Sequence, residues 1–134
     1  MILIADSTVL YSALAYRGPE NRVLFSGRHV FVTTQSNTSE IRRIVIKKRG
    51  LSDTEALRLI ESMPVLVVED SFIEGRWKEA EQIIGGRDKS DVPLVALALS
   101  LPGHDGIWST DKDFEVVKGR FKVWKTRELL PSKG

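Results

Sequence analysis

The sequence predicts an α/β protein, a three-layer α/β/α sandwich around a mostly parallel central sheet. Short, continuous apolar runs recur along the chain, and such runs are typical of strands that are buried on both faces. They alternate with longer segments in which apolar residues recur at helical spacing. This alternation is typical of a parallel sheet with helices on both of its faces.

The elements follow one another with recognisable boundaries. Short apolar runs predict strands at residues 2–5, 29–33, 65–68, 107–109 and 121–124. Helices are expected to begin at Asp6, Asn37, Ser52, Ser71 and Val92. Three of these starts have a polar residue followed by Glu three positions later, the spacing of a capping box: Asn37 with Glu40, Ser52 with Glu55, and Ser71 with Glu74. Residues 88–91 are expected to form a polar loop before the most apolar helix.

Composition narrows the class of protein. The 134 residues are 42% hydrophobic and 28% charged, which is typical of a soluble globular protein, and we expect a single domain over 1–134 with a frayed tail at 131–134. The absence of cysteine excludes disulfides and zinc–thiolate sites and favours a cytoplasmic location. No leader or membrane span is expected, because residues 92–101 are too short an apolar run to cross a bilayer. The net charge of +2 permits nucleic-acid binding without identifying it.

Four separated acids are expected to meet at one edge of the sheet. Asp6 directly follows the first predicted strand and Asp111 follows the fourth, so parallel strands place both at the same edge. Asp91 opens the apolar helix, and Glu40 lies near the start of another. Oxygen ligands without His or Cys suit Mg²⁺ or Mn²⁺, which can activate water and stabilise charge that develops on a phosphate. Each acid taken alone also fits a helix cap, so the metal site depends on their convergence.

The motifs that contain these acids resemble those of PIN-domain ribonucleases, most closely the VapC-like toxins. In chain order they are Ile-Leu-Ile-Ala-Asp6-Ser-Thr-Val-Leu, Thr38-Ser-Glu40-Ile, Asp88-Lys-Ser-Asp91-Val-Pro-Leu, and Ile107-Trp-Ser-Thr-Asp111-Lys-Asp-Phe. The resemblance runs from Ile2 to about Leu130, nearly the whole chain. Each motif is short, and their order and spacing together make the resemblance specific.

The resemblance implies a Rossmann-like fold, metal-dependent cleavage of single-stranded RNA, frequent homodimers and, in VapC relatives, an antitoxin protein that blocks the cleft. It places Asp6, Glu40, Asp91 and Asp111 on the four acidic positions, and Asp113 on an additional acid near the site. The family often has Asn or Ser where this chain has Thr8, and commonly Thr where it has Ser109. Both residues keep a hydroxyl that can hydrogen-bond a carboxylate or a bound water, so we expect them to support the ligands.

Two basic residues are candidates for RNA binding. Arg43 and Lys47 follow Glu40 by three and seven positions and therefore share its helix face, where they would contact phosphates. An equally good interpretation is a solvated face with a Glu40–Arg43 ion pair.

Two further functions remain open. A non-catalytic PIN-like module that binds RNA or protein is one. An Mg²⁺-dependent phosphatase with Asp6 as nucleophile is the other, although Thr8 occupies the position where a second acid would be expected as proton donor. The sequence leaves undecided the RNA target, the preferred metal and the choice between a toxin and a stand-alone nuclease.

Overall fold

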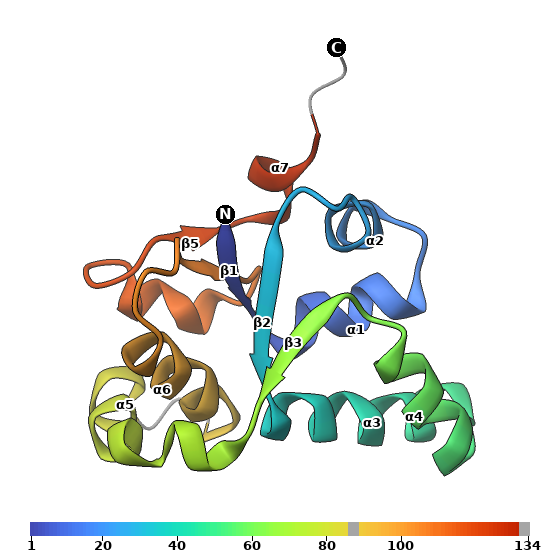
Figure 1. Ribbon diagram of the computed structural model, residues 1–134, viewed down its shortest axis with the longest axis horizontal. Helices are drawn as coiled ribbons and strands as arrows, with labels where there is room; N and C mark the ends of the chain where they lie inside the picture. Colours follow the sequence, from blue (N-terminus) through green and yellow to red (C-terminus); the bar gives the residue numbers. More distant parts are fainter. Residues whose placement is uncertain (86–88, 132–134) are drawn as a thin grey trace.

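The computed structural model describes residues 1–85 and 89–131, and Figure 1 shows how its elements are arranged. The strands are β1 (Ile2–Ala5), β2 (Val30–Thr34), β3 (Val65–Val68), β4 (Ile107–Trp108) and β5 (Val123–Trp124). The α-helices are α1 (Ser7–Ala15), α2 (Pro19–Leu24), α3 (Gln35–Arg49), α4 (Asp53–Glu61), α5 (Trp77–Ile84), α6 (Val92–Ser100) and α7 (Thr126–Leu129). Short 3₁₀ turns are η1 (Asp70–Phe72), η2 (Glu74–Arg76), η3 (Lys89–Asp91) and η4 (Lys112–Val117).

The five strands form one parallel sheet in the order β3-β2-β1-β4-β5. Strands β2 and β3 lie in turn on one side of β1, and the chain then crosses to the other side of β1, where β4 and β5 lie. The strand order therefore reverses between β1 and β4. In open parallel sheets a ligand site lies outside the carboxyl ends of the strands at such a point.

Helices cover both faces of the sheet, which confirms the predicted sandwich. Alternate residues of β1 point to opposite sides: Leu3 and Ala5 join a core formed with α1 to α4 and α7, whereas Ile4 joins a second core with α5, α6 and η4. In Figure 1, α5 and α6 lie on one side of the sheet and α1 to α4 on the other. Trp108 of β4 is fully buried in the first core and Ile107 in the second.

Helix α6 is the deepest element. All of its residues from Val92 to Ala98 are buried, which agrees with its almost unbroken apolar sequence. Because this helix is fixed by packing on every side, the residue at its start, Asp91, is held in a defined position.

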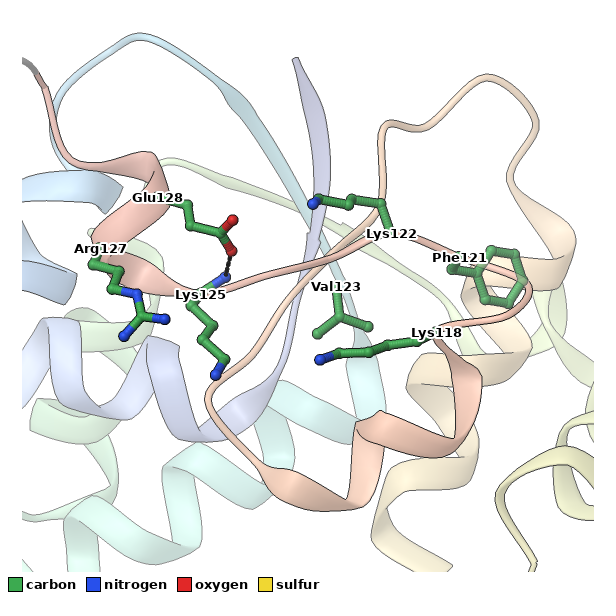
Figure 2. A pocket seen from close by; sticks show the side chains of 7 residues that line it. All are labelled: Lys118, Phe121, Lys122, Val123, Lys125, Arg127 and Glu128. Carbon is green, nitrogen blue, oxygen red and sulfur yellow. Dashed lines mark hydrogen bonds between the residues drawn. The ribbon is translucent and has the colours of Figure 1, made fainter.

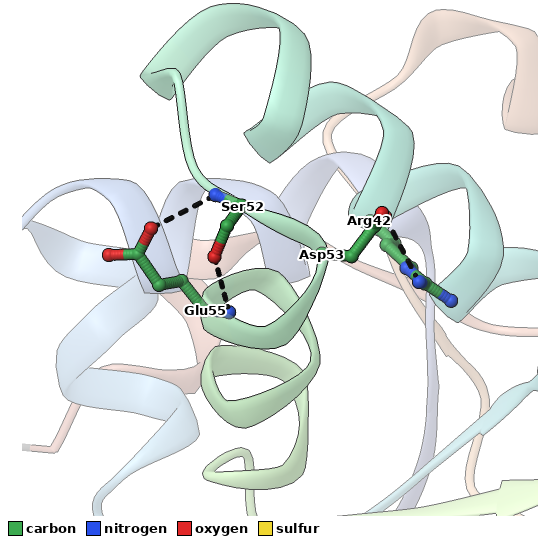
Figure 3. Close-up of polar contacts among 4 residues, drawn as sticks. All are labelled: Arg42, Ser52, Asp53 and Glu55. Carbon is green, nitrogen blue, oxygen red and sulfur yellow. Dashed lines mark hydrogen bonds and ion pairs between the residues drawn. The ribbon is translucent and has the colours of Figure 1, made fainter.

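Local hydrogen bonds fix two helix starts. The Glu128 carboxylate accepts a hydrogen bond from the Lys125 backbone N–H at 2.9 Å where α7 follows β5 (Figure 2). The capping box predicted for Ser52 and Glu55 is present at α4, where an Arg42–Asp53 ion pair of 3.1 Å also joins α3 to α4 (Figure 3).

Two other predicted caps are wrong. Helix α3 begins two residues earlier than expected, because the Thr34 hydroxyl accepts from the Asn37 backbone N–H at 3.0 Å and takes the capping role. The segment at Ser71–Glu74 forms the turns η1 and η2, and α5 begins only at Trp77, without a side-chain cap.

The third strand is not the buried strand that its apolar run predicts. Strand β3 lies at the edge of the sheet, with Leu66 62% and Val67 46% exposed. The short helices α2 and α7 were not predicted either. Residues 86–88 and 132–134, which include Asp88 of the predicted polar loop and most of the predicted frayed tail, lie outside the described residues. Among the described helices, none combines the length and apolar character needed to cross a membrane.

Candidate metal centre at the carboxyl edge of the sheet

Asp6 is a buried acid at the end of β1. Its side chain is 4% exposed, and one carboxylate oxygen accepts from the Val9 backbone N–H at 2.9 Å, which caps α1. The other oxygen accepts a short hydrogen bond from the Ser109 hydroxyl, on the neighbouring β4 segment. Asp6 is therefore both a helix cap and a member of a polar site, two roles that the sequence left as alternatives.

Burial raises the pKa of Asp6 from 3.8 to about 6, and the negative charge of Asp111 adds to the rise. The hydrogen bonds from Ser109 and from the backbone N–H groups of Val9 and Thr8 act in the opposite direction. A nearby cation would strongly stabilise this carboxyl, because it favours the ionised form that burial disfavours.

Three further acids meet beside Asp6. One carboxylate oxygen from each of Asp91, Asp111 and Asp113 lies within 4.8 Å of the other two. Asp111 also caps η4 by accepting from the Asp113 backbone N–H at 2.9 Å, and its own N–H donates to Ser109 Oγ at 3.0 Å. Ser109 thus connects Asp6 to the Asp111 loop.

Glu40 enters the site through a network that the sequence analysis missed. The Asn37 amide donates to Ser7 Oγ at 2.7 Å, and the Ser7 hydroxyl donates to Glu40 at 3.4 Å. Asn37 is itself fixed by Thr34, whose hydroxyl donates to the Asn37 amide oxygen at 2.6 Å. These buried polar residues bring α1 and α3 together at the carboxyl end of β2. A signal was present in the sequence, because Thr34 and Asn37 have the spacing of a cap and its third helical residue.

Side chains from the end of β1, from α1, from α3 and from the Asp111 loop line a small cleft of about 70 Å³. Its lining includes the acids Asp6, Glu40, Asp91 and Asp111. All four acids expected to converge therefore do so, at the switch point between β1 and β4. Asp113, expected only as an additional acid, is part of the tightest group.

The other predicted site residues lie around this cleft or away from it. Thr8 is exposed and lines the cleft, and it acts on Asp6 through its backbone N–H. Ser109 is 1% exposed and bonds Asp6 directly, as expected for a supporting hydroxyl. Arg43 and Lys47 are exposed on α3 and are not among the residues that line the cleft.

The donor set fits a small, hard divalent cation. Two ligands on opposite sides of an octahedral Mg²⁺ with bonds of about 2.1 Å lie roughly 4.2 Å apart. The oxygens of Asp91, Asp111 and Asp113 are separated by no more than 4.8 Å, so a slight adjustment lets them share one ion. Carboxylate oxygens favour Mg²⁺ or Mn²⁺ over softer metals.

Two solved structures share the fold of this chain. The chain resembles the crystal structure of the sarcin–ricin loop cleaving toxin VapC20 of Mycobacterium tuberculosis, with a TM-score of 0.68 and 18% identity over 98% of this chain and 100% of that one. It also resembles VapBC2 of Rickettsia felis, determined with a DNA fragment from its promoter, with a TM-score of 0.65 and 14% identity over 93% of this chain and 98% of that one. These likenesses show a shared fold. A search of curated proteins finds no match.

A family model described as the PIN domain matches residues 4–132 and so covers almost the entire chain, from the second residue of β1 to beyond α7. The matched region includes every acid of the cleft. The chain therefore belongs to the PIN-domain family, a family of nucleases that use a divalent metal ion.

Proposed function

We propose that the protein is a metal-dependent endoribonuclease that cleaves single-stranded RNA at the acid cleft. The observation that carries this proposal is the meeting of Asp91, Asp111 and Asp113 within 4.8 Å, together with the cleft that Asp91 and Asp111 line with Asp6 and Glu40. A cluster of carboxylates with this composition suits Mg²⁺ or Mn²⁺, which supplies an activated water and stabilises negative charge on the phosphate.

The residues of the chain have distinct parts in this proposal. Asp91, Asp111 and Asp113 would hold the ion, because they form the tightest group of oxygens. Asp6 would complete the ligand set, held in place by Val9 N–H and Ser109. Glu40 lies at the rim of this set and would position a water through its oxygens, with Ser7 fixing its orientation.

The two structural relatives support a toxin role with an antitoxin protein as partner. We propose in addition that the antitoxin covers the cleft and that the nuclease acts as a homodimer in the cytoplasm. One relative is a toxin that cleaves the sarcin–ricin loop, and the other is a VapBC2 assembly bound to promoter DNA. In this proposal the RNA is the substrate and the antitoxin a regulatory partner.

The alternative of a phosphatase with Asp6 as nucleophile is disfavoured by the residue two positions on. Thr8 lines the cleft where a second acid would be expected as proton donor, and a threonine hydroxyl is too weak an acid for that role. A non-catalytic module would not need the complete set of acids that the cleft contains.

The proposal is tested by single-turnover cleavage of labelled single-stranded RNA in Mg²⁺ or Mn²⁺. Asp111→Asn removes a ligand charge while keeping the side-chain volume, and should lower the rate by at least about 100-fold. Glu61→Gln, at an exposed acid on α4, is the matched control and should cleave like the unmodified protein. Cleavage by a purified Asp6→Asn/Asp111→Asn double variant at the unmodified rate would refute the proposal.

A further inference from the structure

A groove leads away from the acid cleft along β5. Two cavities of about 270 Å³ and about 410 Å³ share Val123 and Lys125 as lining residues. The smaller cavity is also lined by Asp111, which lines the acid cleft as well. The three hollows are therefore neighbours, in the order acid cleft, smaller cavity, larger cavity. We name the two cavities together the β5 groove.

The register of the sheet fixes how far the groove lies from the acids. The Asp6 backbone N–H donates to Trp108 O at 3.2 Å, and the Ser109 N–H donates to Trp124 O at 3.1 Å. The ends of β1, β4 and β5 are thus side by side. Because neighbouring strands lie about 4.8 Å apart, the backbone at Lys125 is roughly 10 Å from that at Asp6.

The lining of the β5 groove is strongly basic. Its cations are Lys112, Lys118, Lys122, Lys125 and Arg127. Apart from Asp111 at the cleft end, its acids are Glu115 and Glu128. Glu115 pairs with Lys118 at 2.7 Å, and Glu128 accepts from the Lys125 backbone N–H. These hydrogen bonds, with smaller contributions from nearby lysines, lower the pKa of both glutamates, and the groove keeps an excess of positive charge.

Figure 2 shows how these side chains lie. Lys118, at the end of η4, and Lys125, after β5, extend on the same side of the strand, with Val123 between them. Arg127 of α7 follows beyond Lys125, and the half-buried ring of Phe121 lies at the opposite end. A row of cations that follows the path of a backbone is the usual charged component of a single-strand nucleic-acid site.

The acid cleft itself creates a need for such a groove. A divalent ion would offset only part of the negative charge of its carboxylates and would act only at the phosphate that is cut, so the attraction that holds the rest of the strand comes from cations outside the cleft. The α3 cations Arg43 and Lys47 do not line the cleft, whereas Lys125 lines the cavity that adjoins it.

We propose that the β5 groove binds the sugar–phosphate backbone of single-stranded RNA on one side of the bond that is cut. This inference rests on the proposed function and names where its substrate lies. Lys125 and Arg127 contact phosphates. The groove recognises charge and shape, so it contributes affinity with little sequence preference.

The test separates RNA binding from cleavage. Binding of a fluorescein-labelled single-stranded RNA of randomised sequence is measured by anisotropy in EDTA, across a range of salt concentrations. The Lys125→Ala/Arg127→Ala double variant removes two exposed cations, and it preserves the bond to Glu128 because that bond uses the Lys125 backbone. The matched control is Arg58→Ala/Lys78→Ala, which removes two exposed cations from α4 and α5.

We expect the groove variant to bind at least about tenfold more weakly, with a salt slope reduced by about 1.4, since each phosphate contact on a single strand contributes about 0.7. The control should change affinity less than about twofold. Equal weakening in the two variants, or none in the groove variant, would overturn the proposal. Poly-glutamate serves as a second probe in the same binding assay. If the groove variant loses binding to poly-glutamate and keeps its RNA binding, the proposal is also overturned, because the groove would then be a site for an acidic protein.

A parallel cleavage assay in Mg²⁺ distinguishes the two proposals. Groove-dependent RNA binding without any cleavage would contradict the nuclease function and leave the groove as an RNA site. Cleavage and binding that are both unchanged in the groove variant would retain the nuclease and remove the groove from it.

Discussion

Asp6 should destabilise the metal-free fold at neutral pH, and replacing it with Asn should make the protein more stable. Asn keeps the shape of the side chain and is a good helix cap, so its amide oxygen can still accept from Val9 N–H. Its amide nitrogen can donate to Ser109, whose hydroxyl oxygen accepts as well as donates. The substitution therefore removes the charge and preserves both contacts.

The magnitude follows from the pKa of Asp6, which burial raises from 3.8 to about 6. The folded protein binds the proton of the Asp6 carboxyl more tightly than the unfolded chain does, so protonated Asp6 stabilises the fold. This stabilisation is fully present below about pH 4 and is lost as the pH rises towards 6. Each pH unit in this window is worth about 1.4 kcal/mol, so the loss at neutral pH is about 3 kcal/mol.

Urea unfolding in EDTA, followed by tryptophan fluorescence, to which the fully buried Trp108 contributes, measures this difference. The free energy of unfolding of Asp6→Asn should exceed that of the unmodified protein by up to about 3 kcal/mol at pH 7.5, and the gap should close towards pH 4. Glu61→Gln serves as a control with no expected pH-dependent difference. A variant that is less stable at pH 7.5, or a gap that does not change with pH, would refute the reasoning.

Three other predictions follow from the same contacts. Mg²⁺ at 100 times its dissociation constant should stabilise the unmodified protein by about 2.7 kcal/mol in thermal unfolding, and it should stabilise Asp111→Asn much less. Equal stabilisation of the two proteins would argue against a metal site at Asp111. Ser109→Ala removes the hydrogen bond that lowers the pKa of Asp6, so it should weaken Mg²⁺ binding by roughly 10- to 100-fold in a calorimetric titration. It should also move the acidic limb of the pH–rate profile of RNA cleavage to higher pH. An unchanged pH–rate profile would contradict this role of Ser109. Gly106 has a φ of +129°, and an added Cβ would lie 2.4 Å from Lys122 O. Gly106→Ala should therefore lower the free energy of unfolding in urea by roughly 2–4 kcal/mol. A decrease below about 0.5 kcal/mol would show that the backbones of β4 and β5 shift to accept the Cβ.

The sequence was sufficient to predict the acids at strand ends. Asp6 directly follows a buried strand and Asp111 lies three residues beyond the end of another, and parallel pairing brings them to one edge, as the structure has it. Asp91 was predictable for a similar reason, because it opens a helix that is apolar on all sides. Asp113 was expected only as an additional acid near the site, because its approach to Asp91 depends on the compact turn of η4.

Other features depend on tertiary contacts that a sequence pattern does not contain. The bonds from Asn37 to Ser7 and from Ser7 to Glu40 join residues about thirty positions apart, and only the packing of α1 against α3 creates them. Strand β3 has the same apolar composition as the central strands, and only the strand order makes Leu66 an exposed edge residue. The β5 groove likewise forms where η4, β5 and α7 meet, and its cations are scattered along the sequence.

A divalent ion in the acid cleft that cleaves RNA should be visible in single-turnover kinetics. Cleavage of a randomised pool of single-stranded RNA is followed across a titration of Mg²⁺, with Asp6→Asn as the comparison. We predict a rate that rises to saturation with Mg²⁺, vanishes in EDTA and falls by at least about 100-fold in the variant. Cleavage that persists in EDTA, or that proceeds equally in Asp6→Asn, would exclude a metal-dependent nuclease site in this cleft.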